Sequence, residues 1–166
     1  MGKFGVLGLL LGLAGCADTA TPPETALAPA VRREGANLAA APIALVSLQG
    51  APDGPGQDFE AALKRELTSR GVAMSAPKGA RYMLRGYLAA RPGQGGADIS
   101  YVFDVYDRAR VRSARLDASF AVKGDGDAWS LMDGKTVDAL AGQSADDIAA
   151  WLSQTPEASP ALSYAQ

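Results

Sequence analysis

Cys16 has few possible chemical roles, because it is the only cysteine among 166 residues. A disulfide would need a second cysteine, and a catalytic thiolate would need a base to activate it. The chain contains no histidine, which is the commonest general base and metal ligand. We therefore expect Cys16 to be an attachment point and not a reagent.

Cys16 follows a short apolar leader. The run Leu13-Ala14-Gly15-Cys16 resembles the bacterial lipobox, in which the cysteine thiol receives a diacylglycerol and becomes the new N-terminus. An apolar run of about ten residues is too short to span a hydrocarbon core as a helix. We expect residues 1–15 to be a lipoprotein signal peptide. The resemblance implies a covalent lipid on Cys16 and no other cofactor.

The residues after Cys16 indicate which membrane, inner or outer, holds the chain. In enterobacteria an aspartate directly after the lipidated cysteine retains a lipoprotein in the inner membrane. Here that position is Ala17, and the aspartate follows at Asp18. The resemblance therefore implies an outer-membrane lipoprotein that faces the periplasm. Two or three acyl chains hold a protein stably on a membrane, whereas one gives only marginal residence.

Carboxylates are the remaining side chains that could catalyse a reaction or bind a metal. Asp98, Asp104 and Asp117 fall on the expected solvent face of a sheet, among arginines, and cross-strand ion pairs account for them there. The acidic turn at 125–133 lacks the ligand spacing of an EF-hand loop. We expect neither enzyme activity nor a metal site.

The charges are unevenly distributed. Residues 64–115 contain eleven Lys or Arg and four Asp or Glu, whereas residues 116–166 contain two basic and eight acidic side chains. Such asymmetry indicates either an anionic partner or two segments that neutralise each other within one fold. The whole chain has 16 basic and 18 acidic side chains, which argues against binding to nucleic acid.

The composition divides the chain into four parts. After the leader, residues 16–41 are rich in Ala, Thr and Pro and predict a disordered tether. We expect residues 31–34 within it to be solvated; the alternatives are that they dock on the domain or lie near anionic lipid. Residues 42–155 hold the periodic apolar patterns of one domain, and residues 156–166, with two prolines, predict a flexible tail. No segment of the domain is apolar enough to cross a bilayer.

Periodicity predicts the elements of the domain. The apolar run 43–48 is typical of a strand buried on both faces, and helical spacing predicts helices over 57–70 and 134–153, the second capped by Asp133. Alternation over 81–88, 98–106 and 115–122 predicts three antiparallel strands, and 72–75 is a candidate edge strand. The fold class is α+β, with two layers: a mixed four- or five-stranded sheet and two helices on one face, in the order β-α-β-β-β-α.

The solvent face of the three-stranded meander is the candidate partner-binding surface. It combines arginines with tyrosine, methionine and valine, and Arg and Tyr are enriched in protein interfaces, whereas Met supplies adaptable contacts. The candidate residues are Arg81, Met83, Arg85, Tyr87, Val102 and Tyr106.

Four stretches give the domain a family resemblance. YMLRGYLAA, ISYVFDVYD, GDAW and DDIAAWL resemble, in order and spacing, a set of uncharacterised alphaproteobacterial lipoproteins. The order of elements is more remotely similar to the N-terminal domain of TolB and to the penicillin-binding-protein activator LpoB. Prolines that this lipoprotein family usually carries before the tryptophan and before the last helix are replaced here by Ala128 and Gly134. The remote resemblance implies a periplasm-facing binding module without catalysis, and the lipobox cysteine is the only functional residue carried over.

These observations together predict a lipid-anchored, non-catalytic envelope lipoprotein. We expect its partners to be the membrane, through the anchor, and a periplasmic or outer-membrane protein or a cell-wall component. The alternative is an accessory or assembly factor for an anionic glycolipid such as lipopolysaccharide, which would use the basic segment 64–115.

Overall fold

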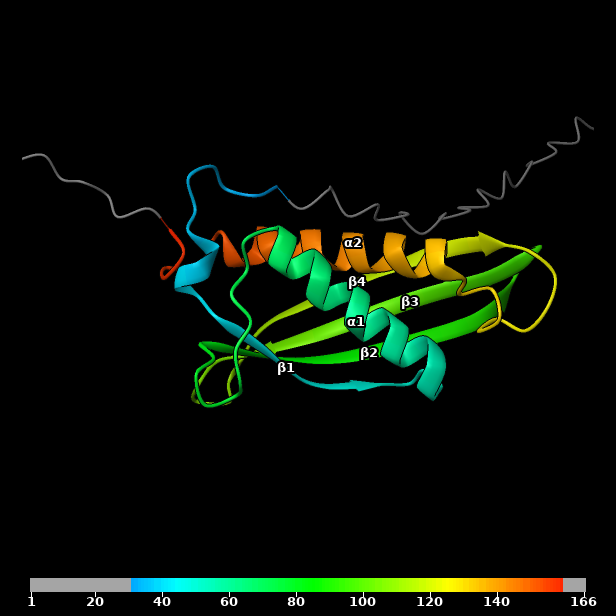
Figure 1. Cartoon of the computed structure of the whole chain (residues 1–166), viewed down its shortest axis with the longest axis horizontal. Helices are drawn as coiled ribbons and strands as arrows, with labels where there is room; N and C mark the ends of the chain where they lie inside the picture. Colours follow the sequence, from blue (N-terminus) through cyan, green and yellow to red (C-terminus); the bar gives the residue numbers. More distant parts are fainter. Residues whose placement is uncertain (1–30, 160–166) are drawn as a thin grey trace, which may run out of the picture.

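The computed structural model describes residues 31–159 as a two-layer α+β domain (Figure 1). The short 3-10 helix η1 (Leu38–Ala40) precedes strand β1 (Ile43–Gln49) and helix α1 (Asp53–Ser69). A three-stranded meander follows and leads into the last helix. These elements are β2 (Tyr82–Gly93), β3 (Gly96–Tyr106), β4 (Arg112–Lys123) and α2 (Gly134–Leu152).

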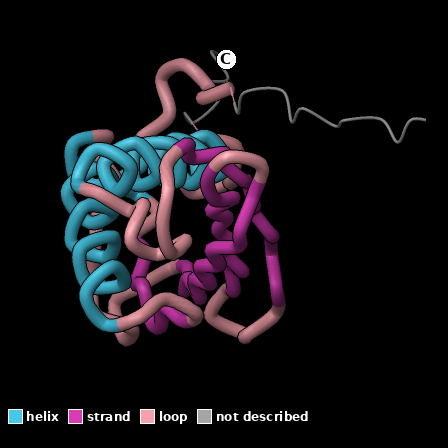
Figure 2. Tube along the Cα trace, turned by 90° about the vertical axis from the view of Figure 1, so that its right-hand side faces the viewer, coloured by secondary structure: helices cyan, strands magenta, loops and turns pink. Residues whose placement is uncertain are grey.

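The four strands form one mixed sheet in the order β1-β2-β3-β4. β1 pairs with β2 in parallel, across the connection through α1, and the other two pairings are antiparallel. Figure 2 shows both helices on one side of this sheet. The predicted fold class and element order are confirmed, with four strands in the sheet. Residues 72–75 contribute an isolated bridge from Met74 to Ile43.

β1 differs from its prediction as a strand buried on both faces. It lies at the edge of the sheet, and Val46 is 38% exposed, at a register irregularity between Leu45 and Ser47. A continuous apolar run is also what a half-covered edge strand shows when its outward residues are small or branched. The sequence alone does not distinguish the two cases.

Helix α1 presents the predicted apolar stripe to the sheet, with Phe59, Leu63 and Leu67 fully buried. It begins at Asp53, four residues before the predicted start, because Pro55 is tolerated in a first turn, where its missing N–H would have no intrahelical partner. The helix ends at Ser69, one residue before its predicted end, and the predicted stop residue Gly71 follows with a φ of 78°, which is readily adopted only by glycine.

Helix α2 begins as predicted after Asp133, whose carboxylate accepts a hydrogen bond of 2.8 Å from the Thr136 amide. That bond lowers the pKa of Asp133. The buried face of α2 includes Leu140, Ile148 and Leu152 and packs with α1 over the sheet.

The domain extends beyond both predicted boundaries. Residues 31–41, predicted as tether, lie on the domain: Leu38 is 2% exposed, and the Arg33 amide donates to Ser153 Oγ at 2.8 Å. Residues 156–159, predicted as tail, pack against the same region. Ala158 is fully buried, and its carbonyl accepts a hydrogen bond of 2.9 Å from the Asn37 amide. Each segment supplies the other with partners, so neither could be recognised from its own composition.

Candidate functional site on the outer face of the sheet

The strand register brings five of the six predicted surface residues together. Met83 lies opposite Tyr106, Tyr87 lies opposite Val102, and Arg85 stands between the two pairs. Because side chains alternate between the faces of a sheet, these five project from the side opposite the helices. We call this surface the docking face; it consists of Met83, Arg85, Tyr87, Val102 and Tyr106.

Arg85 and the tyrosines give the docking face its chemistry. The Arg85 guanidinium carbon lies 5.1 Å from the centroid of the Tyr106 ring, a cation–π contact. Within residues 31–159, Arg85 forms no ion pair. Tyr87 is 37% exposed, which is high for a large hydrophobic side chain in this domain. The face therefore presents a cation without an ion pair beside two aromatic rings, and the carboxylate opposite it in the register, Asp104, is buried.

Arg81, the sixth predicted residue, is not part of this face. Its Nε donates to Glu157 at 2.5 Å, and the Tyr82 hydroxyl donates to the other oxygen of the same carboxylate at 2.8 Å. The hydrogen bond to Glu157 raises the pKa of Arg81. Tyr82 in turn packs edge-on against Trp151, with 4.9 Å between ring centroids. Arg81 thus fixes the C-terminal segment to the sheet.

Asp104 corrects the expectation that the carboxylates of this face are solvent-exposed. It is only 6% exposed, and its Oδ1 lies 3.3 Å from Arg115 and 3.5 Å from Arg112. β3 is an inner strand, so the long side chains of its neighbours cover its outward residues. Asp98 and Asp117, by contrast, are exposed as predicted.

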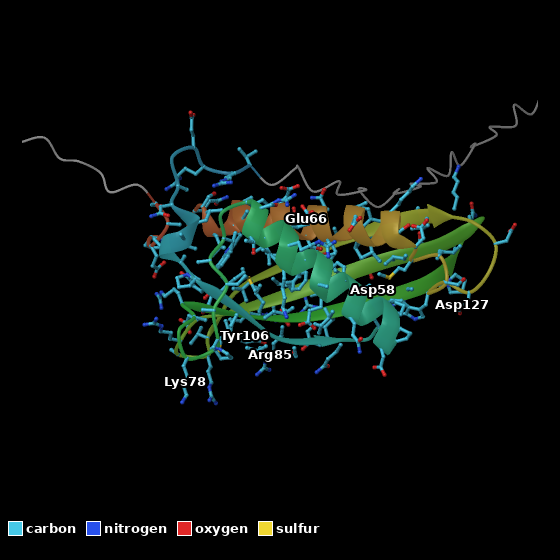
Figure 3. The ribbon with its side chains drawn as sticks, in the orientation of Figure 1. Asp58, Glu66, Lys78, Arg85, Tyr106 and Asp127 are labelled. Atoms are coloured by element: carbon cyan, nitrogen blue, oxygen red, sulfur yellow. The ribbon has the colours of Figure 1, made fainter. Side chains whose placement is uncertain are left out.

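Three cations of the basic segment 64–115 pair with carboxylates outside the C-terminal part: Lys64 with Glu60, and Arg112 and Arg115 with Asp104. The structure divides the other cations into two groups. Three arginines pair with acidic residues of the C-terminal part, as internal neutralisation predicts: Arg65 with Asp138, Arg70 with Asp146 and Arg81 with Glu157. A second group forms no ion pair with any residue of the described chain and includes Lys78, Arg85, Arg108 and Arg110. In Figure 3 the labelled Lys78 and Arg85 lie near Tyr106, at the end away from Asp127.

Three of these cations surround a shallow hollow beside the docking face. The hollow has a volume of about 300 Å³, and we call it the basic hollow. It is lined by Pro77, Lys78, Ala80, Met83, Arg108 and Arg110. Sequence analysis missed this site. The available signal was that the turn before β2 and the turn after β3 both carry cations, and an antiparallel pairing of β2 with β3 brings those turns together.

The acidic turn has structural roles. Asp127 Oδ1 accepts a hydrogen bond of 2.9 Å from the Trp129 amide, and Asp133 caps α2. Residues 31–159 contain no cluster of three or more His, Cys, Asp or Glu suited to a metal ion. None of the helices in that range has the length and apolarity needed to cross a membrane. Cys16 and the lipobox residues Leu13, Ala14 and Gly15 lie outside the described residues.

Three solved structures match parts of this chain at low sequence identity and with TM-scores below 0.5. A minor lipoprotein from Acinetobacter baumannii is 23% identical, with 66% of this chain and 92% of that chain covered and a TM-score of 0.45. The PelC dodecamer from Paraburkholderia phytofirmans is 14% identical over 76% of this chain and 94% of that one, with a TM-score of 0.45. Lipoprotein GNA1162 from Neisseria meningitidis is 13% identical over 64% and 96%, with a TM-score of 0.40. No family model and no curated protein matches the chain.

Proposed function

We propose that this protein is a lipid-anchored lipoprotein of the outer membrane that acts without catalysis, by binding another envelope protein through the docking face. The observation that carries the binding role is the placement of Arg85 over Tyr106 on the side of the sheet opposite both helices (Figure 2). The lipobox at Leu13–Cys16 and the alanine at position 17 support the anchor and the choice of membrane.

The composition of the docking face favours a protein partner with an acidic contact surface. Tyrosine and arginine dominate the residues that contribute most to protein–protein affinity, and methionine adapts its shape to a partner. Arg85 forms no ion pair among the described residues, because Asp104, which lies opposite it in the register, pairs with Arg112 and Arg115; an acidic group of a partner would therefore complete Arg85. The aromatic ring beneath it holds the guanidinium in place and reduces the entropy lost on binding.

With the proposed anchor on Cys16, the docked N-terminal segment would keep the domain close to the membrane. Since residues 31–41 belong to the domain, only fourteen residues, 17–30, separate it from Cys16. A flexible chain of that length has a root-mean-square span of roughly 20 Å. The docking face would then meet partners that lie at or near the membrane surface.

The absence of histidine supports a non-catalytic role, since the chain lacks the usual general base. Several carboxylates of the described residues form ion pairs, a helix cap or hydrogen bonds that stabilise the fold. Asp104 and Glu157 are two such carboxylates.

The anchor is tested by labelling cells with radioactive palmitate. The full chain should incorporate the label, and Cys16→Ala should not. A second variant, in which residues 1–16 are replaced by a cleavable signal peptide without a cysteine, should move from the membrane fraction to the soluble periplasm. Palmitate label that persists in Cys16→Ala would refute the assignment of Cys16 as the lipidated residue.

The docking face is tested by photo-crosslinking in cells. A benzophenone amino acid at position 87 should give a discrete adduct with an envelope protein, and Arg85→Glu should reduce that adduct at least fivefold. A benzophenone at position 61, exposed on α1, is the matched control and should give none. Adducts of equal yield from both positions would show that the face is not selective.

A further inference from the structure

The basic hollow combines cations with an apolar floor. Lys78, Arg108 and Arg110 supply the charge, and the remaining lining residues, Pro77, Ala80 and Met83, are apolar. A volume of about 300 Å³ is at the lower end of the range for small-molecule sites, enough for a phosphate group and part of the group that carries it.

The three cations of the basic hollow, Lys78, Arg108 and Arg110, outnumber the single carboxylate in the two turns that form it, and within residues 31–159 none of the three is held in an ion pair. The carboxylate nearest in sequence is Asp107, whose Oδ1 accepts a hydrogen bond of 2.9 Å from the Val111 amide and so stabilises the turn. Three cations around one concavity form a site complementary to an anion with several oxygens.

The two turns that form the basic hollow are held together in advance of any ligand. Arg108 Nε donates to the Ala80 carbonyl at 3.1 Å, which ties the turn after β3 to the segment before β2. The turn itself is closed by a hydrogen bond of 3.0 Å from the Arg110 amide to the Asp107 carbonyl. A site with its cations already positioned binds with a smaller loss of conformational entropy.

Arg110 occupies its position at a conformational cost. Its φ of 63° is the only positive value among the non-glycine residues of the described chain. Glycine would adopt this conformation without strain, whereas an L-residue with a Cβ does so unfavourably. An arginine held there against backbone preference points to a role for its side chain.

The neighbouring Val111 indicates that the ligand carries an apolar part. Its side chain is 61% exposed and directly follows Arg110 at the tip of the turn. An exposed valine beside three cations is the combination with which peripheral proteins contact anionic lipid, through charge and apolar insertion together. Free phosphate would make no use of the valine or of the apolar floor.

We propose that the basic hollow binds the phosphate of an anionic lipid headgroup, with Lys78, Arg108 and Arg110 on the phosphate and Val111 against the lipid. This inference rests on the proposed lipid anchor, which holds the domain beside such headgroups. It adds a second site, next to the protein-binding docking face and sharing Met83 with it. Anchor, headgroup and partner would then be engaged by one small domain.

The test uses the full lipidated chain in cells grown with [³²P]phosphate. A benzophenone amino acid at position 77, in the wall of the basic hollow, should give a ³²P-labelled lipid adduct. Lys78→Ala combined with Arg110→Gly should reduce the label at least fivefold. Arg110→Gly also relieves the strained φ, so loss of label in this variant would not result from unfolding.

A charge-matched variant separates a site from general electrostatics. Lys123→Ala combined with Lys135→Ala removes the same amount of positive charge. Lys123 lies far from the basic hollow, because it pairs with Gly96 at the start of β3, whereas the hollow lies beside Tyr106 at the end of that strand. This variant should keep the label within a factor of two. An equal loss in both variants, an absence of label, or an unlabelled protein adduct from position 77 would each overturn the proposal. Palmitate labelling of the same cells confirms the anchor, so such a result would count against the basic hollow alone.

A direct comparison of two probes tests whether the ligand is a lipid phosphate or free phosphate. In detergent, the purified lipidated chain should bind dihexanoyl phosphatidic acid at least tenfold more tightly than inorganic phosphate, followed by the NMR shift of the Arg110 amide. Val111→Ser should weaken the lipid and leave inorganic phosphate unchanged. Equal affinity for the two probes would refute the lipid assignment.

Discussion

Asp104 on β3 lies directly opposite Arg115 on β4, and its carboxylate accepts a hydrogen bond of 3.3 Å from the Arg115 guanidinium. The two side chains differ in solvent exposure: that of Asp104 is 9% exposed and that of Arg115 is 50% exposed. A buried carboxylate therefore depends on arginines that are themselves largely hydrated. This arrangement stabilises the sheet on its outward side, where Asp104 lies between Val102 and Tyr106 of the docking face.

Replacing Asp104 with alanine should lower the free energy of unfolding by about 1 kcal/mol in urea denaturation, since the arginines regain water and offset part of the lost interaction. Asp117→Ala is the matched control, because Asp117 is an exposed carboxylate of the adjacent strand. Its effect should stay within about 0.5 kcal/mol. Equal losses in the two variants would contradict the distinction between them.

Tyr101 should be protected from ionisation by its surroundings. Burial and the hydrogen bond from its hydroxyl to Asp147 raise the pKa of Tyr101. Above about pH 10, the ordinary tyrosine pKa, the unfolded chain releases this proton while the folded chain keeps it, so the free energy of unfolding falls as pH rises.

Tyr101→Phe should reduce that alkaline slope and cost about 1–2 kcal/mol at neutral pH, because Asp147 loses a donor and keeps only Gln143 on its other oxygen. Denaturation curves from pH 7 to about pH 11 measure both effects. An unchanged slope would show that the raised pKa does not contribute to stability.

Glu157 should make the C-terminal segment sensitive to acid. Burial opposes the charge of Glu157, but hydrogen bonds from its own amide, Tyr82 and Arg81 prevail and lower its pKa. Its stabilisation is therefore present above the ordinary glutamate pKa of about 4.3 and is lost as pH falls through the lower folded value.

Glu157→Gln should weaken this attachment by about 1 kcal/mol at neutral pH. The amide of Asn37, bonded to the Ala158 carbonyl, reports on it, and its hydrogen exchange should accelerate several-fold. Glu60→Gln, on the exposed surface of α1, should leave that amide unchanged. Similar acceleration in both variants would mean that Glu157 does not hold the segment.

Gly86 should not tolerate a side chain. A Cβ at this position would lie 2.7 Å from both Leu48 and Phe103, well inside contact distance. Gly86→Ala should therefore destabilise the domain by about 1–3 kcal/mol in urea denaturation, through overpacking of the core.

Gly134→Ala is the matched control for this glycine, because a Cβ at this position, at the start of α2, would have no neighbour within 4 Å. Alanine there should be neutral or stabilising by up to about 1 kcal/mol. A destabilisation equal to that of Gly86→Ala would show that loss of glycine itself, and not the contact with Phe103, is responsible.

Local sequence patterns were enough to predict much of the fold. Alternation along β2, β3 and β4 specified which residues face the helices, because a strand repeats every two residues whatever lies around it. Phe59, Leu63 and Leu67 specified the buried side of α1 in the same way, and Asp133 specified the start of α2. Once the strands pair antiparallel, the same alternation brings the five residues of the docking face together.

The sequence by itself thus determined the elements of the meander and the two helices, their order and their inward and outward faces. Only the tertiary structure decided which charges meet: it joined Arg81 to Glu157, buried Asp104 and left Lys78 and Arg110 around a hollow. The physical reason is the separation in sequence over which each kind of interaction acts. Periodicity and capping act within a few residues, whereas an ion pair or a shared hollow joins residues up to 76 positions apart, and the chain path alone brings them into contact.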